Sequence, residues 1–321
     1  MVCSSHACTS NTPTIRSYHI GLSSLTPPNS YTLVVSNIPS DSEYRPNSIR
    51  TIAHLQNLIT SKTSIPLSAI YKLDTSLTLL PYHYLLLSSP APEWIPLSKA
   101  RKSNIFSPEQ SARIDLQLGL HLRQLHFIQN DWFGLPLPGG KEPAEPSYSW
   151  QESFVLFLET ILVELESHPA NESGLEIPFE EIRKYLSRAI GFFLFDDVEV
   201  PSLIGFTWSD EDVLIALPSA LESGEPRIAF LPLPTHALWA DPMLETFLMP
   251  PGPSQALLEA YMDGRGPLII FPRQRTKRVW YTLFLAGSVI VEGARDGGGK
   301  AGWAAAVIRE CVDQLKDAPC Y

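Results

Sequence analysis

Hydrophobic and polar positions change their period along the chain. A β-rich stretch with alternating side chains occupies residues 31–36, and residues 65–74 and 82–88 are predicted as further strands. Residues 47–60 differ, because isoleucine and leucine recur there every three or four positions, the spacing of one helix face. The first third of the chain is therefore predicted as a small region of strands with one helix.

The rest of the chain is dominated by helical spacing. Residues 107–110, Ser-Pro-Glu-Gln, combine an N-cap serine, a first-turn proline and a glutamine at the third helical position. Together these residues satisfy amide groups that a helix start leaves unpaired, so a long helix is predicted from here to about Asn130. Further helices are predicted over residues 150–166, 178–195, 250–261, 276–291 and 300–317.

This layout predicts an α+β protein with two lobes, a small α/β N-lobe and a larger, mainly helical C-lobe. We assign residues 1–30 to an N-terminal extension with the first strand or strands, residues 31–90 to the small lobe, and residues 91–321 to the helical lobe.

Composition narrows the choice of partners. The chain has 321 residues, of which 44% are hydrophobic and 18% charged, as in an ordinary globular protein. Its net charge of −10 argues against nucleic acid, whose phosphates it repels overall. The longest apolar run, residues 279–291, is too short for a membrane span. The N-terminus is polar, without a secretory leader, so we expect a cytoplasmic protein that binds a small molecule or a protein partner.

Residues 201–242 carry the most specific pattern. They begin Pro-Ser-Leu-Ile-Gly-Phe-Thr-Trp-Ser-Asp-Glu-Asp-Val-Leu-Ile, and they end Ala-Leu-Trp-Ala-Asp-Pro. This frame resembles the aminoglycoside phosphotransferase and choline-kinase-like family, which has P-x-L-V-H-G-D-L-x-P-G-N-V-L-V, then I-D-W, then A-L-W-G-D-P. Residues 118–128 also resemble the family's L-x-x-L-H helix. The resemblance covers the chain from about residue 31, is strongest to fungal members, and implies a protein-kinase-like fold.

The resemblance also implies that three chemical positions are altered. The family's base aspartate falls on Thr207, its magnesium-binding asparagine on Asp212, and its second metal aspartate on Leu233. Phosphoryl transfer needs a carboxylate at the acceptor hydroxyl and hard oxygen ligands for magnesium. We therefore predict a catalytically degenerate protein with no cofactor. Mg-ATP is expected only if the chain is an atypical phosphotransferase.

Four side chains in this segment are predicted to bind the ligand: Phe206, Trp208, His236 and Trp239. His236 is the weak catalytic candidate, although a buried structural histidine is the simpler interpretation. For the last position of the frame, Asp241, the resemblance implies a structural role, accepting hydrogen bonds from the backbone of the catalytic loop.

Two charged clusters have competing interpretations. Residues 273–278 hold three arginines and one lysine, which suit an anionic ligand or a lipid headgroup but more often form a solvated helix start or contact a partner with an acidic surface. Asp196, Asp197 and Glu199 have a spacing compatible with a metal site, which chance also produces.

Three functions follow for this sequence. The first is a degenerate kinase-like protein, a pseudokinase, that binds a small molecule or partner. The second is a repurposed enzyme of fungal secondary metabolism that performs non-phosphoryl chemistry on an apolar substrate, with His236 and Asp212 as candidate acid–base groups. The third is an active phosphotransferase with a relocated metal site, for which Asp210, Glu211 and Asp212 are weak candidates.

Overall fold

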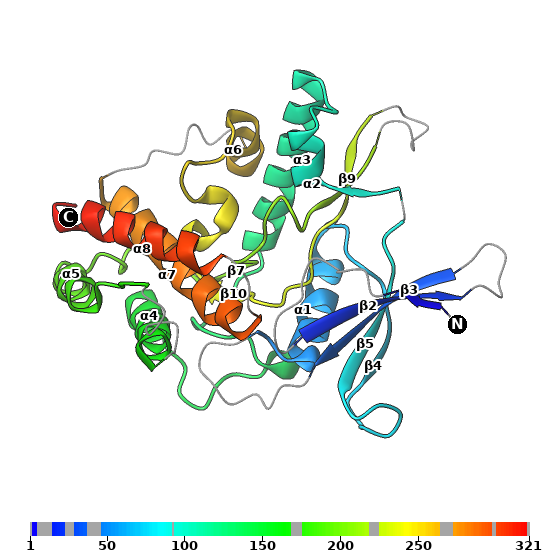
Figure 1. The fold of residues 1–321 in the computed structure, drawn as a ribbon, viewed down its shortest axis with the longest axis horizontal. Helices are drawn as coiled ribbons and strands as arrows, with labels where there is room; N and C mark the ends of the chain where they lie inside the picture. The colour runs from blue at the N-terminus through cyan, green and yellow to red at the C-terminus, as the bar shows by residue number, and fades with distance from the viewer. Residues whose placement is uncertain are drawn as a thin grey trace.

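The computed structural model describes residues 2–4, 15–22, 29–36, 46–91, 93–167, 175–217, 225–263, 272–296 and 300–319. A sheet-containing lobe, formed by the N-terminal part of the chain, adjoins a larger helical lobe (Figure 1). The α+β two-lobed architecture predicted from the sequence is confirmed.

The small lobe is an antiparallel sheet with the strand order β1-β2-β3-β5-β4. Its strands are β1 (Val2–Ser4), β2 (Ile15–Leu22), β3 (Asn29–Ser36), β4 (Ile70–Asp74) and β5 (His83–Ser88). Val34 of β3 and Leu85 of β5 are paired on neighbouring strands, and both are fully buried against helix α1. Alternation along these strands therefore buries one face and leaves the other facing solvent.

Helix α1 (Ile49–Lys62) begins two residues after the predicted start at residue 47. The Ser48 hydroxyl accepts a hydrogen bond from the Thr51 amide at 3.2 Å and so caps the helix. Ile52, Leu55 and Ile59 lie on one face and are fully buried, as their spacing requires.

Two helices form the middle of the molecule. In α3 (Pro108–His126) the predicted capping box is present: the Gln110 amide donates to the Ser107 hydroxyl, and the Ser107 amide donates to the Gln110 side chain, each at 3.2 Å. Helix α6 (Gln255–Met262) packs closely against α3 at Gly119.

The helical lobe is built on α4 (Trp150–Ser167), α5 (Phe179–Gly191), α7 (Pro272–Asp296) and α8 (Ala301–Lys316). Aromatic side chains fill its core, where the Phe154 ring lies 5.1 Å from that of Tyr281 and 5.6 Å from that of Phe284. The shorter elements of the structure are α2 (Leu97–Lys102), η1 (Pro138–Gly140), β6 (Ile95–Pro96), β7 (Ser202–Ile204), β8 (Leu214–Ala216), β9 (Arg227–Phe230), β10 (Leu238–Ala240), η4 (Pro242–Leu244) and η5 (Thr246–Leu248).

Several predicted helix boundaries were wrong. Helix α5 ends at Gly191, because Phe193 adopts a left-handed backbone with φ +52°. Helix α6 begins after Ser254, whose hydroxyl accepts from the Leu257 amide. Helix α7 begins at Pro272, so the basic cluster lies inside its first two turns. Among the described residues, no helix combines the length and the apolar character that crossing a bilayer requires.

Gly119 offers a test of the packing between α3 and α6. A Cβ atom at this position would lie 2.2 Å from the carbonyl oxygen of Leu257, and a backbone atom yields little. We expect Gly119→Ala to lower the free energy of unfolding by about 2–3 kcal/mol, measured by urea denaturation. The matched control is Gly293→Ala in α7, where no atom lies within 4 Å, and we expect it to be neutral or stabilising by about 0.5–1 kcal/mol. Equal midpoints for the two variants would contradict this account.

Candidate functional site

A two-stranded ribbon brings the candidate segments together. β7 and β10 pair antiparallel, with Ile204 opposite Leu238, and all their residues are buried. Because the last residue of β7 lies beside the first residue of β10, the loop after β7 and the loop before β10 leave the ribbon at the same end.

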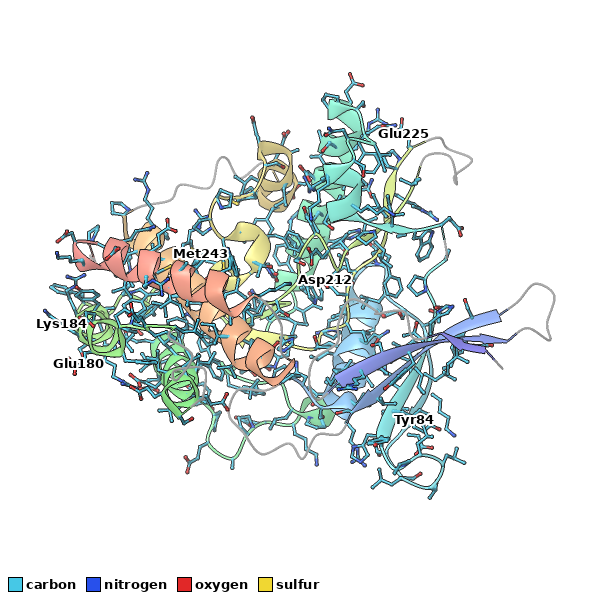
Figure 2. The ribbon with its side chains drawn as sticks, viewed as in Figure 1. Tyr84, Glu180, Lys184, Asp212, Glu225 and Met243 are labelled. Carbon is cyan, nitrogen blue, oxygen red and sulfur yellow. The ribbon has the colours of Figure 1, made fainter. Side chains whose placement is uncertain are left out.

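These two loops, with α7 and the start of α8, enclose a cavity of about 440 Å³. Its apolar wall includes Trp208, Leu233, Leu285, Val289 and Trp303. Its polar wall comprises Thr207, Ser209, Glu211, Asp212, Thr235, His236, Thr246, Ser288, Glu292 and Lys300, with Pro232 beside them. Asp212 lies near the centre of the molecule (Figure 2).

The cavity unites the three positions that the resemblance compares with the family's chemical residues. Thr207, Asp212 and Leu233 all line it, as do the predicted ligand residues Trp208 and His236. Phe206 and Trp239 are not among the lining residues. The Phe206 ring is fully buried and stacks on Phe284 at 5.1 Å, and Trp239 packs edge-on against Trp132.

Leu233 belongs to the hydrophobic cluster of the small lobe. It is 8% exposed and packs with the cluster that contains Val34 and Leu85. The loop around it is held by Asn47, whose side-chain amide donates to the carbonyl oxygens of Pro234 and Ala237, both at 3.0 Å. The position that the resemblance assigns to a metal aspartate is therefore an apolar contact between the lobes.

The loop after β7 is fixed by a buried carboxylate. Glu245 is fully buried, and its Oε2 accepts a hydrogen bond from the Gly205 amide at 2.8 Å. A Cβ atom at Gly205 would lie 2.3 Å from the Trp208 ring, so only glycine allows this approach. The Trp208 indole in turn donates to the carbonyl oxygen of Leu233 at 3.2 Å. Glu245, which the sequence analysis missed, thus takes the contact with the loop backbone that the resemblance implied for Asp241.

Asp241 has different partners from those expected. It is 3% exposed; Oδ1 accepts from the Met243 amide at 2.9 Å, while Oδ2 accepts from the Tyr281 hydroxyl at 2.7 Å. Lys277 Nζ also lies 2.6 Å from Asp241 Oδ2 and 2.6 Å from Asp197 Oδ1. These contacts attach α7 to the segment that follows β10.

The basic cluster is not a solvated helix start. Lys277 is 1% exposed between its two carboxylates. Arg273 lies 3.8 Å from Asp197, and Arg278 donates to the carbonyl oxygen of Leu248. In this cluster Arg275 is the exposed cation. Asp197, considered above as a metal ligand, is a partner of the cluster.

His236 connects three elements inside the cavity. It is 6% exposed, and its Nδ1 lies 3.2 Å from the Thr207 hydroxyl and 3.1 Å from the Thr235 hydroxyl. Its Nε2 lies 2.7 Å from Glu292 Oε1, off the line of the ring N–H, so this contact is electrostatic rather than a linear hydrogen bond. Glu292 was missed because it stands on α7, 56 positions further along the chain, with no local motif around it.

No protein-family model and no curated protein matches this sequence. Solved structures do match its fold. A protein assigned as an aminoglycoside phosphotransferase from Ralstonia eutropha JMP134 superposes with a TM-score of 0.60 at 11% identity, covering 98% of this chain and 93% of that chain. One assigned as a fructosamine-3-kinase from Thermobifida fusca YX-ER1 has a TM-score of 0.55 at 13% identity, covering 97% and 94%.

The chain has a kinase-like phosphotransferase fold. At these identities the likeness establishes the fold and no activity. The activity must therefore be argued from the residues at the cavity.

Magnesium and ATP, which the kinase-like fold implies, do not fit the residues at this cavity. Leu233 offers no oxygen, and Asp212 Oδ2 accepts hydrogen bonds from the Ser209 amide at 3.1 Å and hydroxyl at 2.7 Å. Asp210 is turned to Arg101, at 2.9 Å. Burial raises the pKa of both Asp210 and Asp212, which disfavours the charged form that a cation needs. In the part of the chain that the structure describes, no three His, Cys, Asp or Glu side chains are grouped to hold a metal ion.

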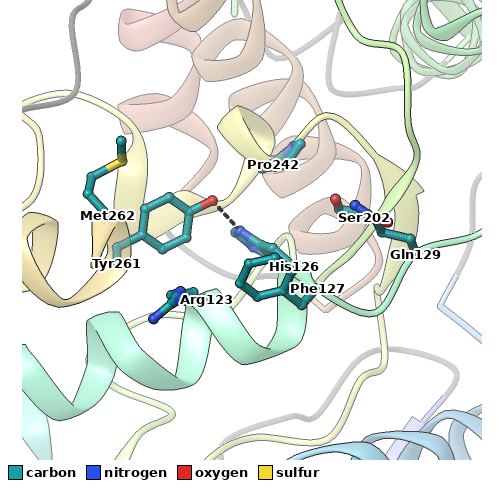
Figure 3. A pocket seen from close by; sticks show the side chains of 8 residues that line it. All are labelled: Arg123, His126, Phe127, Gln129, Ser202, Pro242, Tyr261 and Met262. Atoms are coloured by element: carbon teal, nitrogen blue, oxygen red, sulfur yellow. Dashed lines mark hydrogen bonds between the residues drawn. The ribbon is translucent and has the colours of Figure 1, made fainter. Parts of the chain in front are cut away.

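A second cavity of the kinase-like fold, about 170 Å³, lies at the C-terminal end of α3 (Figure 3). Burial raises the pKa of Tyr261, whose hydroxyl lies at hydrogen-bond distance, 2.7 Å, from His126 Nδ1. His126 Nε2 is 3.7 Å from Glu245 Oε2. Glu245 is therefore shared between this cavity and the loop of the main cavity.

A substitution at Lys277 tests how strongly its ion pairs attach α7 to the segment after β10. In Lys277→Met the two carboxylates lose their buried cation, and we expect the free energy of unfolding to fall by about 3–5 kcal/mol in chemical denaturation. The matched control is Arg275→Met, the same kind of change two residues earlier at an exposed site, for which we expect a change within about 0.5 kcal/mol. A small effect at Lys277 would show that the ion pairs contribute little to the attachment.

Proposed function

We propose that this chain binds an uncharged, largely apolar small molecule in the 440 Å³ cavity and does not transfer phosphoryl groups. The observation that carries the proposal is the placement of Leu233, whose side chain packs into the small-lobe cluster while its loop borders the cavity. A position that needs an oxygen for magnesium is here part of an apolar wall.

The remaining chemistry of phosphoryl transfer is also weakened. Thr207 cannot act as a carboxylate base, and such groups typically contribute about a hundredfold or more to a rate. Ser36, at the end of β3, stands about where the resemblance places the lysine that contacts phosphates, and its side chain is buried. Groups for phosphoryl transfer that the resemblance implies are therefore missing in both lobes, and this supports a binding role.

The cavity has the size and lining of a small-molecule site. Pockets for organic ligands are mostly apolar with a few placed polar groups, and they measure a few hundred cubic ångströms. Trp208, Leu285 and Val289 give apolar surface here, and Thr207 and His236 give hydrogen-bonding groups. The carboxylates of Glu211 and Glu292 outnumber the ammonium group of Lys300, which disfavours an anionic ligand such as a nucleoside triphosphate. A cytoplasmic location and a fungal, secondary-metabolism setting stay predictions from the sequence.

ATP binding tests the negative half of the proposal. Calorimetric titration with ATP, with and without magnesium, is expected to give no magnesium-dependent heat, while an active kinase-like phosphotransferase run in parallel gives micromolar binding. Micromolar, magnesium-dependent binding to this chain would overturn the proposal. It would then favour the relocated metal site at Asp210, Glu211 and Asp212.

Nile red, an uncharged apolar dye, tests the positive half. We expect a saturable rise in its fluorescence with the wild-type protein and at least a tenfold weaker dissociation constant for Val289→Trp, because the indole fills the cavity. Val163→Trp is the matched control, since Val163 is exposed on α4. Equal binding by all three proteins would place the dye elsewhere and contradict the proposed site.

A further inference from the structure

Thr207, His236 and Glu292 form a chain of contacts that a binding pocket alone does not require. The Thr207 hydroxyl lies 3.2 Å from His236 Nδ1, and His236 Nε2 lies 2.7 Å from Glu292 Oε1. The three residues come from the loop after β7, the loop before β10 and helix α7, and all three line the main cavity.

The charge of Glu292 favours one tautomer of His236. Its carboxylate lies 2.7 Å from Nε2, and a negative charge there favours the imidazole tautomer that carries its proton on Nε2. Nδ1 of His236 is then an acceptor, to which the Thr207 hydroxyl at 3.2 Å or the Thr235 hydroxyl at 3.1 Å can donate. This is the order of nucleophile, base and orienting carboxylate found in acyl-transfer enzymes, with the two ring nitrogens exchanged.

The backbone at Thr207 supports a reactive placement. The preceding residue, Phe206, has φ +58°, which costs a non-glycine residue about 1–3 kcal/mol, and the Thr207 amide donates to the carbonyl oxygen of Gly205 at 2.9 Å. This tight turn presents Thr207 to the cavity while the Phe206 ring stays buried on Phe284. Strained turns of this kind concentrate at functional sites.

We propose that Thr207 is the nucleophile of an esterase site, with His236 as its general base and Glu292 as the residue that positions His236. In the first step the bond from Thr207 Oγ1 to the acyl carbon of the ester forms, and the hydroxyl proton moves to His236 Nδ1. The ester C–O bond then breaks, and the departing alcohol takes that proton.

In the second step water attacks the acyl-threonine and gives its proton to His236 Nδ1. The bond from the acyl carbon to Thr207 Oγ1 breaks, and the proton returns to Thr207. The sum is ester plus water giving carboxylic acid plus alcohol, without metal, oxidant or reductant.

The lining of the cavity indicates the class of ester. Trp208, Leu285 and Val289 suit an apolar acyl or alcohol group, and the excess of carboxylates over Lys300 disfavours an anionic substrate and favours release of the acid product. The proposal rests on the proposed function, because it requires that the same cavity admit an uncharged apolar molecule.

The nucleophile is tested with p-nitrophenyl butyrate. We expect a burst of p-nitrophenolate and, in quenched samples, one butyryl group on the peptide that contains Thr207. Thr207→Val, which keeps the shape and removes the hydroxyl, is expected to lower the rate at least about a hundredfold and to abolish the label. Thr207→Ser, which keeps the hydroxyl, is expected to retain both. The matched control is Thr282→Val in α7, where the lost hydroxyl bonds only the carbonyl oxygen of Arg278 in the same helix, and it is expected to behave as wild type.

The other two residues have separate readouts. We expect His236→Gln to lower kcat about 10²- to 10⁴-fold, as for loss of a general base. Glu292→Gln is expected to lower kcat with KM unchanged and to alter the pH profile of kcat, which a purely structural role would not do.

Two outcomes overturn the esterase. In the first, the wild-type protein hydrolyses p-nitrophenyl butyrate no faster than Thr207→Val. In the second, the butyryl group is found only on residues other than Thr207. The Nile red titration separates this failure from that of the binding site. If Val289→Trp loses dye binding but the wild-type protein shows no Thr207-dependent hydrolysis, the binding proposal stands and the esterase proposal falls. If the wild-type protein shows neither dye binding nor hydrolysis, both proposals fall.

Discussion

The contact of Lys277 with Asp241 and Asp197 decides where α7 lies, and α7 forms one wall of the cavity. A buried ammonium without carboxylates is strongly unfavourable, so this helix can take few other positions against the segment after β10. Tyr281 adds a second bond to Asp241 from the next turn of the helix. Glu292 follows Tyr281 by eleven residues, about three helical turns, so the same face that reaches Asp241 also presents Glu292 to His236.

The opposite wall depends on contacts between distant parts of the chain. The β7–β10 ribbon brings two loops to one end, Glu245 holds the first by the Gly205 amide, and Asn47 holds the second by two carbonyl oxygens. None of these contacts needs a phosphate or a metal. The positions of both loops are therefore set by contacts within the protein, among them the packing of Leu233 in the small-lobe core.

Local signals in the sequence predicted the elements well and the site only in part. The capping box at Ser107 and the spacing along α1 depend on neighbours a few residues away, so they are readable without the fold. The burial of Lys277 depends on Asp197, 80 positions earlier, and a basic run without that partner indicates solvent. Glu245 and Glu292 act through equally distant partners and carry no motif. Only the resemblance grouped Thr207, Asp212 and Leu233 in the sequence. It aligns positions along the chain but does not say which side chains surround them in the cavity.

The remaining choice between a binding module and an enzyme turns on His236. Burying an imidazole is unfavourable unless its nitrogens are paired, and the hydroxyls of Thr207 and Thr235 already satisfy Nδ1. Glu292, whose side chain is 25% exposed, places its carboxylate 2.7 Å from Nε2, and a pocket that needs only apolar surface does not require a charged group at that position of α7. A carboxylate beside a histidine that also contacts a hydroxyl is the arrangement that nucleophilic chemistry uses, which is why the contact of Glu292 with His236 favours an enzyme.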